Sequence, residues 1–269
     1  MTTLGRARIA RGLGGKDVAN RILLALPSVS WERMKAHLEP VNLPQGKEIF
    51  VVGAPMKHLY FINRGLVSLV KSMEDGRSVE IGALGIEGVA GLGALYDIES
   101  AIWDSIVQIG GNAFRIDRSS LQGELTRSKA LCELLRRYHY IAVSQFAQTA
   151  ACNRLHSLQQ RFCHWLLIAH DSARSDNFAI THEFLALMLG VQRVRVSIMA
   201  KSLQKAGIIQ YSRNRMSIVN RSALERLACE CYRTIHTQLD RLFGHPSKYP
   251  PARPGALVSE PLKAAGWDR

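Results

Sequence analysis

The pattern of hydrophobic and polar positions changes character along the chain. Residues 18–38 carry apolar side chains at helical spacing, with a break at Pro27. From Val41 onward, short apolar runs alternate with turns rich in Gly, Asp and Asn, which is typical of a small antiparallel barrel or sandwich. Strands are predicted at residues 48–52, 59–63, 66–71, 78–84, 104–109 and 113–116. Asp75-Gly76 predicts a hairpin turn.

The strands give way to helices after Ser119. Residues 128–151 contain no Gly or Pro, and apolar positions recur at steps of three and four, which predicts one long helix. Such a stripe can pack on its own domain or on a second copy of the chain, and we expect it to form the interface of a homodimer. The expected interface residues are Leu131, Leu134, Leu135, Tyr138, Ile141, Ala142 and Gln145.

Residues 180–203 have the pattern of residue sizes that two crossed helices with a tight turn require. Thr181 is a predicted helix cap, and the small Ala186 lets the helices approach closely. Gly190 permits the sharp turn, because glycine adopts a positive φ at little cost. A second helix, anchored by Val196, is predicted to begin near Gln192. This pattern predicts a helix-turn-helix whose second helix can lie in a DNA major groove.

A short β-hairpin is predicted directly after the second helix. Residues 208–211 and 216–219 have the pattern of two strands. The intervening turn carries Arg213 and Arg215, which are placed to reach phosphate or the minor groove. We therefore predict a winged helix-turn-helix.

The charge balance favours a polyanionic partner. The 269-residue chain has 35 Lys and Arg against 22 Asp and Glu, a formal net charge of +13. Between Ile180 and Arg221 the only acidic residue is Glu183, among many basic ones. We expect double-stranded DNA as the partner. The expected contacts are Thr181, Gln192, Arg193, Arg195, Ser197, Lys201, Arg213 and Arg215.

Several stretches resemble the Crp/Fnr family of bacterial transcription regulators. They are residues 43–50 (LPQGKEIF), Gly53 and residues 59–67 (LYFINRGLV), followed by Ile180-Thr181, residues 190–193 (GVQR) and the predicted wing. The resemblance spans roughly residues 20–230. It implies an α+β fold with an N-terminal antiparallel, jelly-roll-like β-roll sensor, a long dimerisation helix and a C-terminal winged helix-turn-helix. The corresponding divisions are a basic tail at 1–17, the sensor at 18–127, the helix at 128–152, the DNA-binding domain at 153–243 and a Pro-rich tail at 244–269. We expect both tails to be disordered.

The resemblance also implies how the protein works. It implies a homodimer with recognition helices in successive major grooves of a near-palindromic site, and RNA polymerase as a further partner of an activator. Arg193 matches the family's guanine-reading arginine, and its guanidinium can bond bidentately to guanine. Val194 stands where the family often has glutamate, and Ile198 where it has a basic residue. We therefore expect a DNA motif that differs from the best-known family sites.

The effector of the sensor is not identified by the sequence. The resemblance suggests an effector pocket at Gly85, Glu87, Gly88, Gly91 and Ser100. However, no Lys or Arg occurs between Gly91 and Phe114, and a buried phosphate without a cation is costly. We expect an effector other than cyclic AMP. The alternative is a cyclic-nucleotide-responsive regulator with a non-standard phosphate pocket.

Cysteine and histidine positions do not predict a cofactor. The chain has five cysteines, an odd number, none before Cys132, which argues against a secreted disulfide framework and against the family's N-terminal iron–sulfur cluster. We expect Cys152, Cys163 and the neighbouring His156, His164 and His170 to be core or interface residues. Cys229 and Cys231 alone do not make a metal site. Haem bound by His58 or His139 stays open. We predict no metal and no cofactor, and the cytoplasm as the compartment.

Other classes of function are disfavoured by what the sequence lacks. It contains no Ser-His-Asp arrangement and no P-loop lysine, so we do not expect an enzyme. No apolar run approaches the roughly 18 residues of a membrane span, so we expect no membrane partner.

Overall fold

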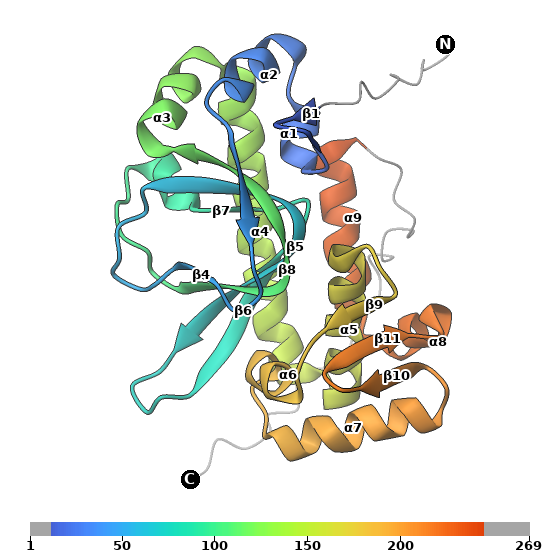
Figure 1. Ribbon diagram of the computed structural model, residues 1–269. Coiled ribbons are helices and arrows are strands. Elements are labelled where there is room, and N and C mark those ends of the chain that lie inside the picture. Colours follow the sequence, from blue (N-terminus) through green and yellow to red (C-terminus); the bar gives the residue numbers. More distant parts are fainter. Residues whose placement is uncertain (1–11, 245–269) are drawn as a thin grey trace, which may run out of the picture.

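The computed structural model describes residues 12–244 (Figure 1). Residues 1–11 and 245–269, which hold most of the two predicted tails, lie outside the described residues. Within the described part of the first tail, β1 (Gly12–Leu13) and β2 (Lys16–Asp17) form a small antiparallel hairpin. Two helices follow, α1 (Arg21–Ala25) and α2 (Ser28–Lys35), and Pro27 separates them as the sequence predicted.

A six-stranded antiparallel sheet forms the N-terminal domain and rolls up around a buried apolar interior. The strand order is β3-β8-β5-β6, with β4 paired to β8 and β7 paired to β5. The bounds are β3 (Glu39–Leu43), β4 (Glu48–Phe50), β5 (His58–Ser72), β6 (Ser78–Leu84), β7 (Val89–Ala90) and β8 (Asp104–Asp117). A 3₁₀ helix, η1 (Leu92–Tyr96), follows β7. The antiparallel β-roll expected from the sequence is confirmed.

Two predicted turns are instead irregularities within long strands. The strands expected at 59–63 and 66–71 are one strand, β5, and those expected at 104–109 and 113–116 are one strand, β8. The pairing register shifts where Gly65 and Gly111 lie opposite each other. A Cβ atom at Gly111 would lie 1.9 Å from the Arg64 carbonyl oxygen, so only glycine allows this close approach. Glycine there permits a bulge and does not end the strand.

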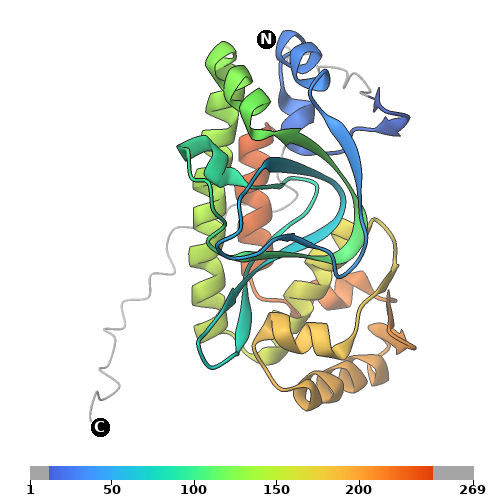
Figure 2. The same ribbon diagram turned by 60° about the vertical axis from the view of Figure 1, so that its left-hand side comes forward.

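Helices follow the sheet without further strands until the DNA-binding domain. They are α3 (Arg118–Arg127) and α4 (Lys129–Leu155), and the Ser128 hydroxyl caps α4 by accepting from the Leu131 amide. The predicted single long helix is thus confirmed. It runs along the β-roll, and α9 (Cys231–Phe243), the last helix of the described residues, lies beside it in both views (Figures 1 and 2).

The C-terminal domain contains a helix-turn-helix and a small sheet. Its elements are α5 (Leu158–Ala173), β9 (Asn177–Ala179), α6 (His182–Leu189), α7 (Arg193–Lys205), β10 (Ile209–Ser212), β11 (Arg215–Ile218) and α8 (Arg221–Leu227). Ser157 and Gln160 form a reciprocal capping box that fixes the start of α5. Strand β9, which pairs with β11, was not predicted, because its three residues are too few to show a strand pattern.

The two domains share one apolar core. Leu66, Val70 and Ile109 of the β-roll belong to the same buried cluster as Phe162 and Trp165 of α5. Helix α6 packs against β6, so the DNA-binding domain rests on the sensor (Figure 1). Within residues 12–244, no helix combines the length and the apolar character that a membrane crossing requires.

Candidate functional site

The turn between α6 and α7 has the geometry that the sequence predicted. The Thr181 hydroxyl accepts from the Phe184 amide at 3.2 Å and caps α6. Gly190 has a φ of 62° and ends α6 in the left-handed conformation. The amide of Val191 then donates to the Ala186 carbonyl at 3.0 Å, which closes the turn. These contacts confirm the predicted cap and the predicted glycine turn.

Helix α7 buries one face and leaves the other free for a partner. Val196, Ala200 and Leu203 pack inward. The outward residues include four of the expected DNA contacts. These exposed residues are Gln192, Arg193, Arg195 and Lys201. Two apolar side chains, Val194 and Ile198, lie on the same outer surface with 65% and 62% exposure.

Two expected contacts have local partners within the domain. The Ser197 hydroxyl lies 2.9 Å from Nδ1 of His182, which ties α7 to the start of α6. Arg193 forms an ion pair with Glu183, Nε to Oε1 at 2.5 Å. Both side chains of this pair are more than 60% exposed, so the pair contributes little stability and its arginine is free to exchange partners.

The predicted wing is a three-stranded sheet in the order β10-β11-β9. Arg213 and Asn214 form its tip, both with positive φ, as a two-residue hairpin turn requires. The side chains of Arg213 and Arg215 are exposed. Figure 1 shows this hairpin beside α7 at the end of the molecule away from α2 and α3. Helix α7 and the wing thus present basic side chains next to each other.

The β-roll encloses a cavity of about 260 Å³ beside α4. Its lining is mostly apolar, and none of the described residues that line it is Lys or Arg. Trp103, which immediately precedes β8, meets Phe146 from α4 edge to face, with ring centroids 5.4 Å apart. Ala142 and His139 of α4 also line the cavity. A ligand held there would touch the long helix directly.

The expected effector residues are only partly at this cavity. Gly91 and Ser100 line it. Gly85, Glu87 and Gly88 do not line it. They lie in the turn between β6 and β7, where a Cβ at Gly85 would meet the Ser172 hydroxyl and one at Gly88 would meet the Tyr138 hydroxyl. These glycines serve close packing against α4 and α5.

Comparison with known proteins identifies both domains. A model of the cyclic nucleotide-binding domain matches residues 40–128, and a model of the Crp-like helix-turn-helix domain matches residues 160–227. Together they cover more than half of the chain. The chain belongs to the Crp/Fnr family. No curated protein matches its sequence significantly.

Solved structures of Crp/Fnr regulators have the same fold. FixK2 from Bradyrhizobium japonicum is similar at 18% identity and a TM-score of 0.60, over 71% of this chain and 98% of that one. A transcriptional regulator of the CRP family from Thermus thermophilus, TTHB099, has 19% identity and a TM-score of 0.59, over 70% and 96%. The c-di-GMP-responsive global regulator CLP of Xanthomonas campestris has 17% identity and a TM-score of 0.55, over 71% and 99%.

The expected dimer residues of this Crp/Fnr chain face inward. Leu131, Leu135, Tyr138, Ala142 and Gln145 are buried within the single chain, and Leu134 and Ile141 pack partly against the same core. A side chain that its own chain covers is not free to contact a partner, and the apolar stripe alone does not show whether its own chain or a second chain covers it. The opposite face of α4 is the open one. It exposes Tyr140, Val143, Ala147 and Ala150 at steps of three and four.

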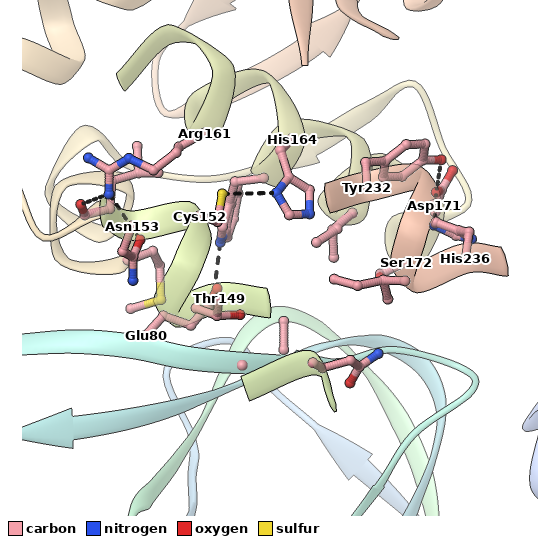
Figure 3. A pocket seen from close by; sticks show the side chains of 18 of the residues that line it. Glu80, Thr149, Cys152, Asn153, Arg161, His164, Asp171, Ser172, Tyr232 and His236 are labelled. Carbon is pink, nitrogen blue, oxygen red and sulfur yellow. Dashed lines mark hydrogen bonds and ion pairs between the residues drawn. The ribbon is translucent and has the colours of Figure 1, made fainter. Parts of the chain in front are cut away.

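A buried carboxyl joins the two domains of the Crp/Fnr fold. Glu80 of β6 accepts a hydrogen bond from the Ser68 hydroxyl, and its Oε2 lies 3.4 Å from the indole Nε1 of Trp165 on α5. Burial raises the pKa of Glu80 to about 7, although both hydrogen bonds act to lower it. Glu80 lines a small cavity of about 90 Å³ between the domains (Figure 3).

Arg221 supports the DNA-binding domain from inside. Its Nη1 lies 2.7 Å from Asp171 Oδ1, and its Nη2 donates to the Tyr232 hydroxyl at 2.7 Å. Burial acts to raise the pKa of Asp171, but hydrogen bonds from His236, Tyr232 and Arg221 outweigh it and hold that pKa at about 2. This network joins α5, α8 and α9, so Arg221 is not available to DNA.

Five of the cysteines and histidines noted in the sequence come together where α4 meets α5 and α9: Cys152, His156, His164, Cys229 and Cys231. Cys152 on α4 lies near Cys229 and Cys231, which are about 80 residues away in the chain. Figure 3 shows Cys152 pointing toward His164 of α5. Spacing along the sequence did not predict this meeting, because Cys152 and His156 lie at the end of α4 whereas Cys229 and Cys231 lie at the start of α9.

Proposed function

We propose that the chain is a homodimeric, sequence-specific DNA-binding regulator that reads its site with α7. The observation that carries the proposal is the outer face of α7, which presents Arg193 and Arg195 beside the wing arginines. In a helix-turn-helix, the first turn of the second helix meets base edges. Wing arginines at a hairpin tip reach phosphate more readily than bases.

The side chains of α7 favour a particular kind of base sequence. Arg193 can exchange its exposed ion pair with Glu183 for two hydrogen bonds to one guanine. Val194 and Ile198 are exposed apolar groups, and thymine offers the matching methyl group in the major groove. We infer that each half-site of the DNA contains a guanine, read by Arg193, with a thymine near it in the sequence.

The exposed face of α4 supports the dimer. Tyr140, Val143, Ala147 and Ala150 form an apolar stripe with small residues toward its end, which lets two copies of the helix approach closely. Two parallel copies of α4 would place two α7 helices on one side of DNA, about one helical turn apart on a near-palindromic site. RNA polymerase is the expected further partner if binding activates transcription.

The sensor cavity favours an uncharged, largely apolar effector. Cyclic AMP, and the c-di-GMP to which the Xanthomonas regulator is said to respond, both carry phosphate. Burying phosphate in this cavity would leave it without a cationic partner from the described lining. Because Ala142 and Phe146 of α4 line the cavity and Val143 faces outward, an effector would act on the helix that carries the dimer seam.

Selection of bound sequences from random DNA tests the proposal. We expect enrichment of a near-palindromic motif and a clear loss of affinity when its guanine is replaced. Equal affinity for selected and random DNA at moderate salt would contradict sequence-specific recognition.

A further inference from the structure

Four potential metal ligands meet where the long helix joins the DNA-binding domain. Cys152 lies near the end of α4 and His156 is its C-cap residue. Cys229 precedes α9 and Cys231 is its first residue. The sulfur and imidazole nitrogen atoms of these side chains all lie within 4.8 Å of one another. All three cysteines are buried, with at most 5% exposure.

Two of the distances between these atoms match tetrahedral zinc coordination. Zn–S bonds of about 2.3 Å and Zn–N bonds of about 2.0 Å at tetrahedral angles place two sulfurs about 3.8 Å apart, and a sulfur and a nitrogen about 3.5 Å apart. The Cys152 and Cys229 sulfurs are 3.6 Å apart, and the Cys231 sulfur lies 3.5 Å from His156 Nδ1. The cysteines are free thiols, and 3.6 Å is well beyond the roughly 2.05 Å of a disulfide.

Surrounding polar side chains contact three of the four ligands, His156, Cys231 and Cys229. The far nitrogen of His156, Nε2, lies 3.3 Å from Glu230 Oε2, so a carboxylate can fix the ring with Nδ1 toward the sulfurs. Gln148 donates its amide N–H to the Cys231 sulfur at 3.0 Å. His164 Nδ1 lies 3.6 Å from the Cys229 sulfur and can donate to it as a neutral ring. Donors of this kind stabilise thiolates.

We propose that Cys152, His156, Cys229 and Cys231 bind one zinc ion and thereby join the end of α4 to the start of α9. Three soft thiolates and one imidazole in a closed tetrahedron are the donor set of a structural zinc site. Binding forms three Zn–S bonds and one Zn–N bond, and the three thiol protons pass to solvent. No redox change is involved.

The site has a structural consequence for the regulator. Helix α4 ends at Leu155 and α5 begins at Leu158, so the metal would lie at the connection between sensor and DNA-binding domain. It would close a loop of 77 residues between Cys152 and Cys229, one that contains the helix-turn-helix and the wing. Zinc would thus fix the position of the DNA-binding domain on α4.

Metal content of the purified chain tests the proposal. Protein prepared under reducing conditions without chelator should contain about one zinc per chain by elemental analysis. Cys152→Ser and Cys229→Ser should each lose most of it, whereas the matched control Cys132→Ser, on α4 but outside the cluster, should retain it. His156→Asn should lose zinc and His164→Asn should keep it. The reverse result for the two histidines would overturn the assignment of His156.

Cobalt substitution of the wild-type chain avoids any dependence on how the variants fold. Co²⁺ should produce sulfur-to-metal charge-transfer absorption and the intense visible bands of tetrahedral coordination, and added Zn²⁺ should displace them. Absence of these bands, or zinc retained in a Cys152→Ser/Cys229→Ser double variant, would overturn the proposal. So would a mass two hydrogens below the reduced chain with no metal, which would reveal a disulfide pair instead.

Discussion

The indole N–H of Trp165 lies 3.4 Å from the carboxyl of Glu80, across the boundary between the DNA-binding domain and the β-roll. The two residues are 85 positions apart in the chain. Ser68 of β5 supplies the other hydrogen bond to Glu80. Burial favours the neutral form of this carboxyl, whereas the two donated hydrogen bonds favour the ionised form, and burial has the larger effect on its pKa.

Stability should fall as the pH rises through the range in which Glu80 titrates. The pKa of Glu80 is about 7 in the folded chain against 4.5 as its reference value. The folded state therefore keeps a proton that the unfolded state loses between these values, and about 3 kcal/mol of stability is lost across this window. Glu80→Gln should remove this loss. Denaturant unfolding below, within and above the window measures it.

Glu74→Gln is the matched control for Glu80→Gln. It also removes one carboxylate, but from an exposed residue in the turn between β5 and β6. It should leave the wild-type pH profile unchanged. Coincident profiles for wild type and Glu80→Gln would show that Glu80 is ionised in the folded chain.

Arg193 should determine base preference, while Arg213 and Arg215 should determine general affinity. Arg193→Ala should cost about 1–3 kcal/mol at one base position per half-site, because a bidentate contact to guanine is lost. Replacing a wing arginine should weaken binding to all sequences equally and reduce the salt slope by about one. Titrations on the selected site and its single-base variants, at several salt concentrations, measure both. A uniform loss for Arg193→Ala would identify it as a phosphate contact.

The exposed face of α4 should carry the dimer. Val143→Asp/Ala147→Asp would place charges in an apolar seam, so sedimentation should show a monomer with unchanged circular dichroism. Leu135→Asp would instead charge the buried core of the sensor and should unfold it. Thr126→Asp, at an exposed position of α3, serves as the control. A dimer that survives the double substitution would place the seam elsewhere.

The sensor cavity should accept an uncharged probe and reject cyclic AMP. Phenylnaphthylamine should fluoresce more strongly in the presence of the chain, whereas calorimetry should detect no saturable binding of cyclic AMP. Ala142→Trp would fill the cavity and should abolish the enhancement, and Ala130→Trp, exposed on the same helix, should not. Micromolar binding of cyclic AMP would require a cation from outside the described lining.

Local rules in the sequence were sufficient for some parts of the structure. The Thr181 cap and the Gly190 turn depend on adjacent residues, and both were predicted. Strand β6 has the predicted bounds because alternation of buried and exposed positions is also local. Gly65 misled the strand prediction, since a bulge and a turn use glycine for the same conformational reason.

Contacts between distant segments were beyond the reach of the sequence alone. The stripe that includes Leu135 predicted a long helix correctly, but not whether its own β-roll or a second chain would cover it. Cys152 and Cys229 meet only because α9 folds back along α4, and neither shows a ligand spacing on its own. The sequence did not indicate a buried role for Glu80, because its burial depends on how α5 packs against the β-roll.

Helix α9 also brings the end of the described chain back to its beginning. Arg21 of α1 forms an ion pair with Asp240 at 3.0 Å, and its guanidinium lies 4.5 Å from the ring centre of Phe243. A chain cut after α8 would retain every residue expected to touch DNA, yet it would lose these contacts between α1 and α9. A deletion that removes α9 should therefore destabilise the sensor before it affects the DNA contacts. If a protease cuts a loop between the domains, the contact between α1 and α9 would still hold the two fragments together.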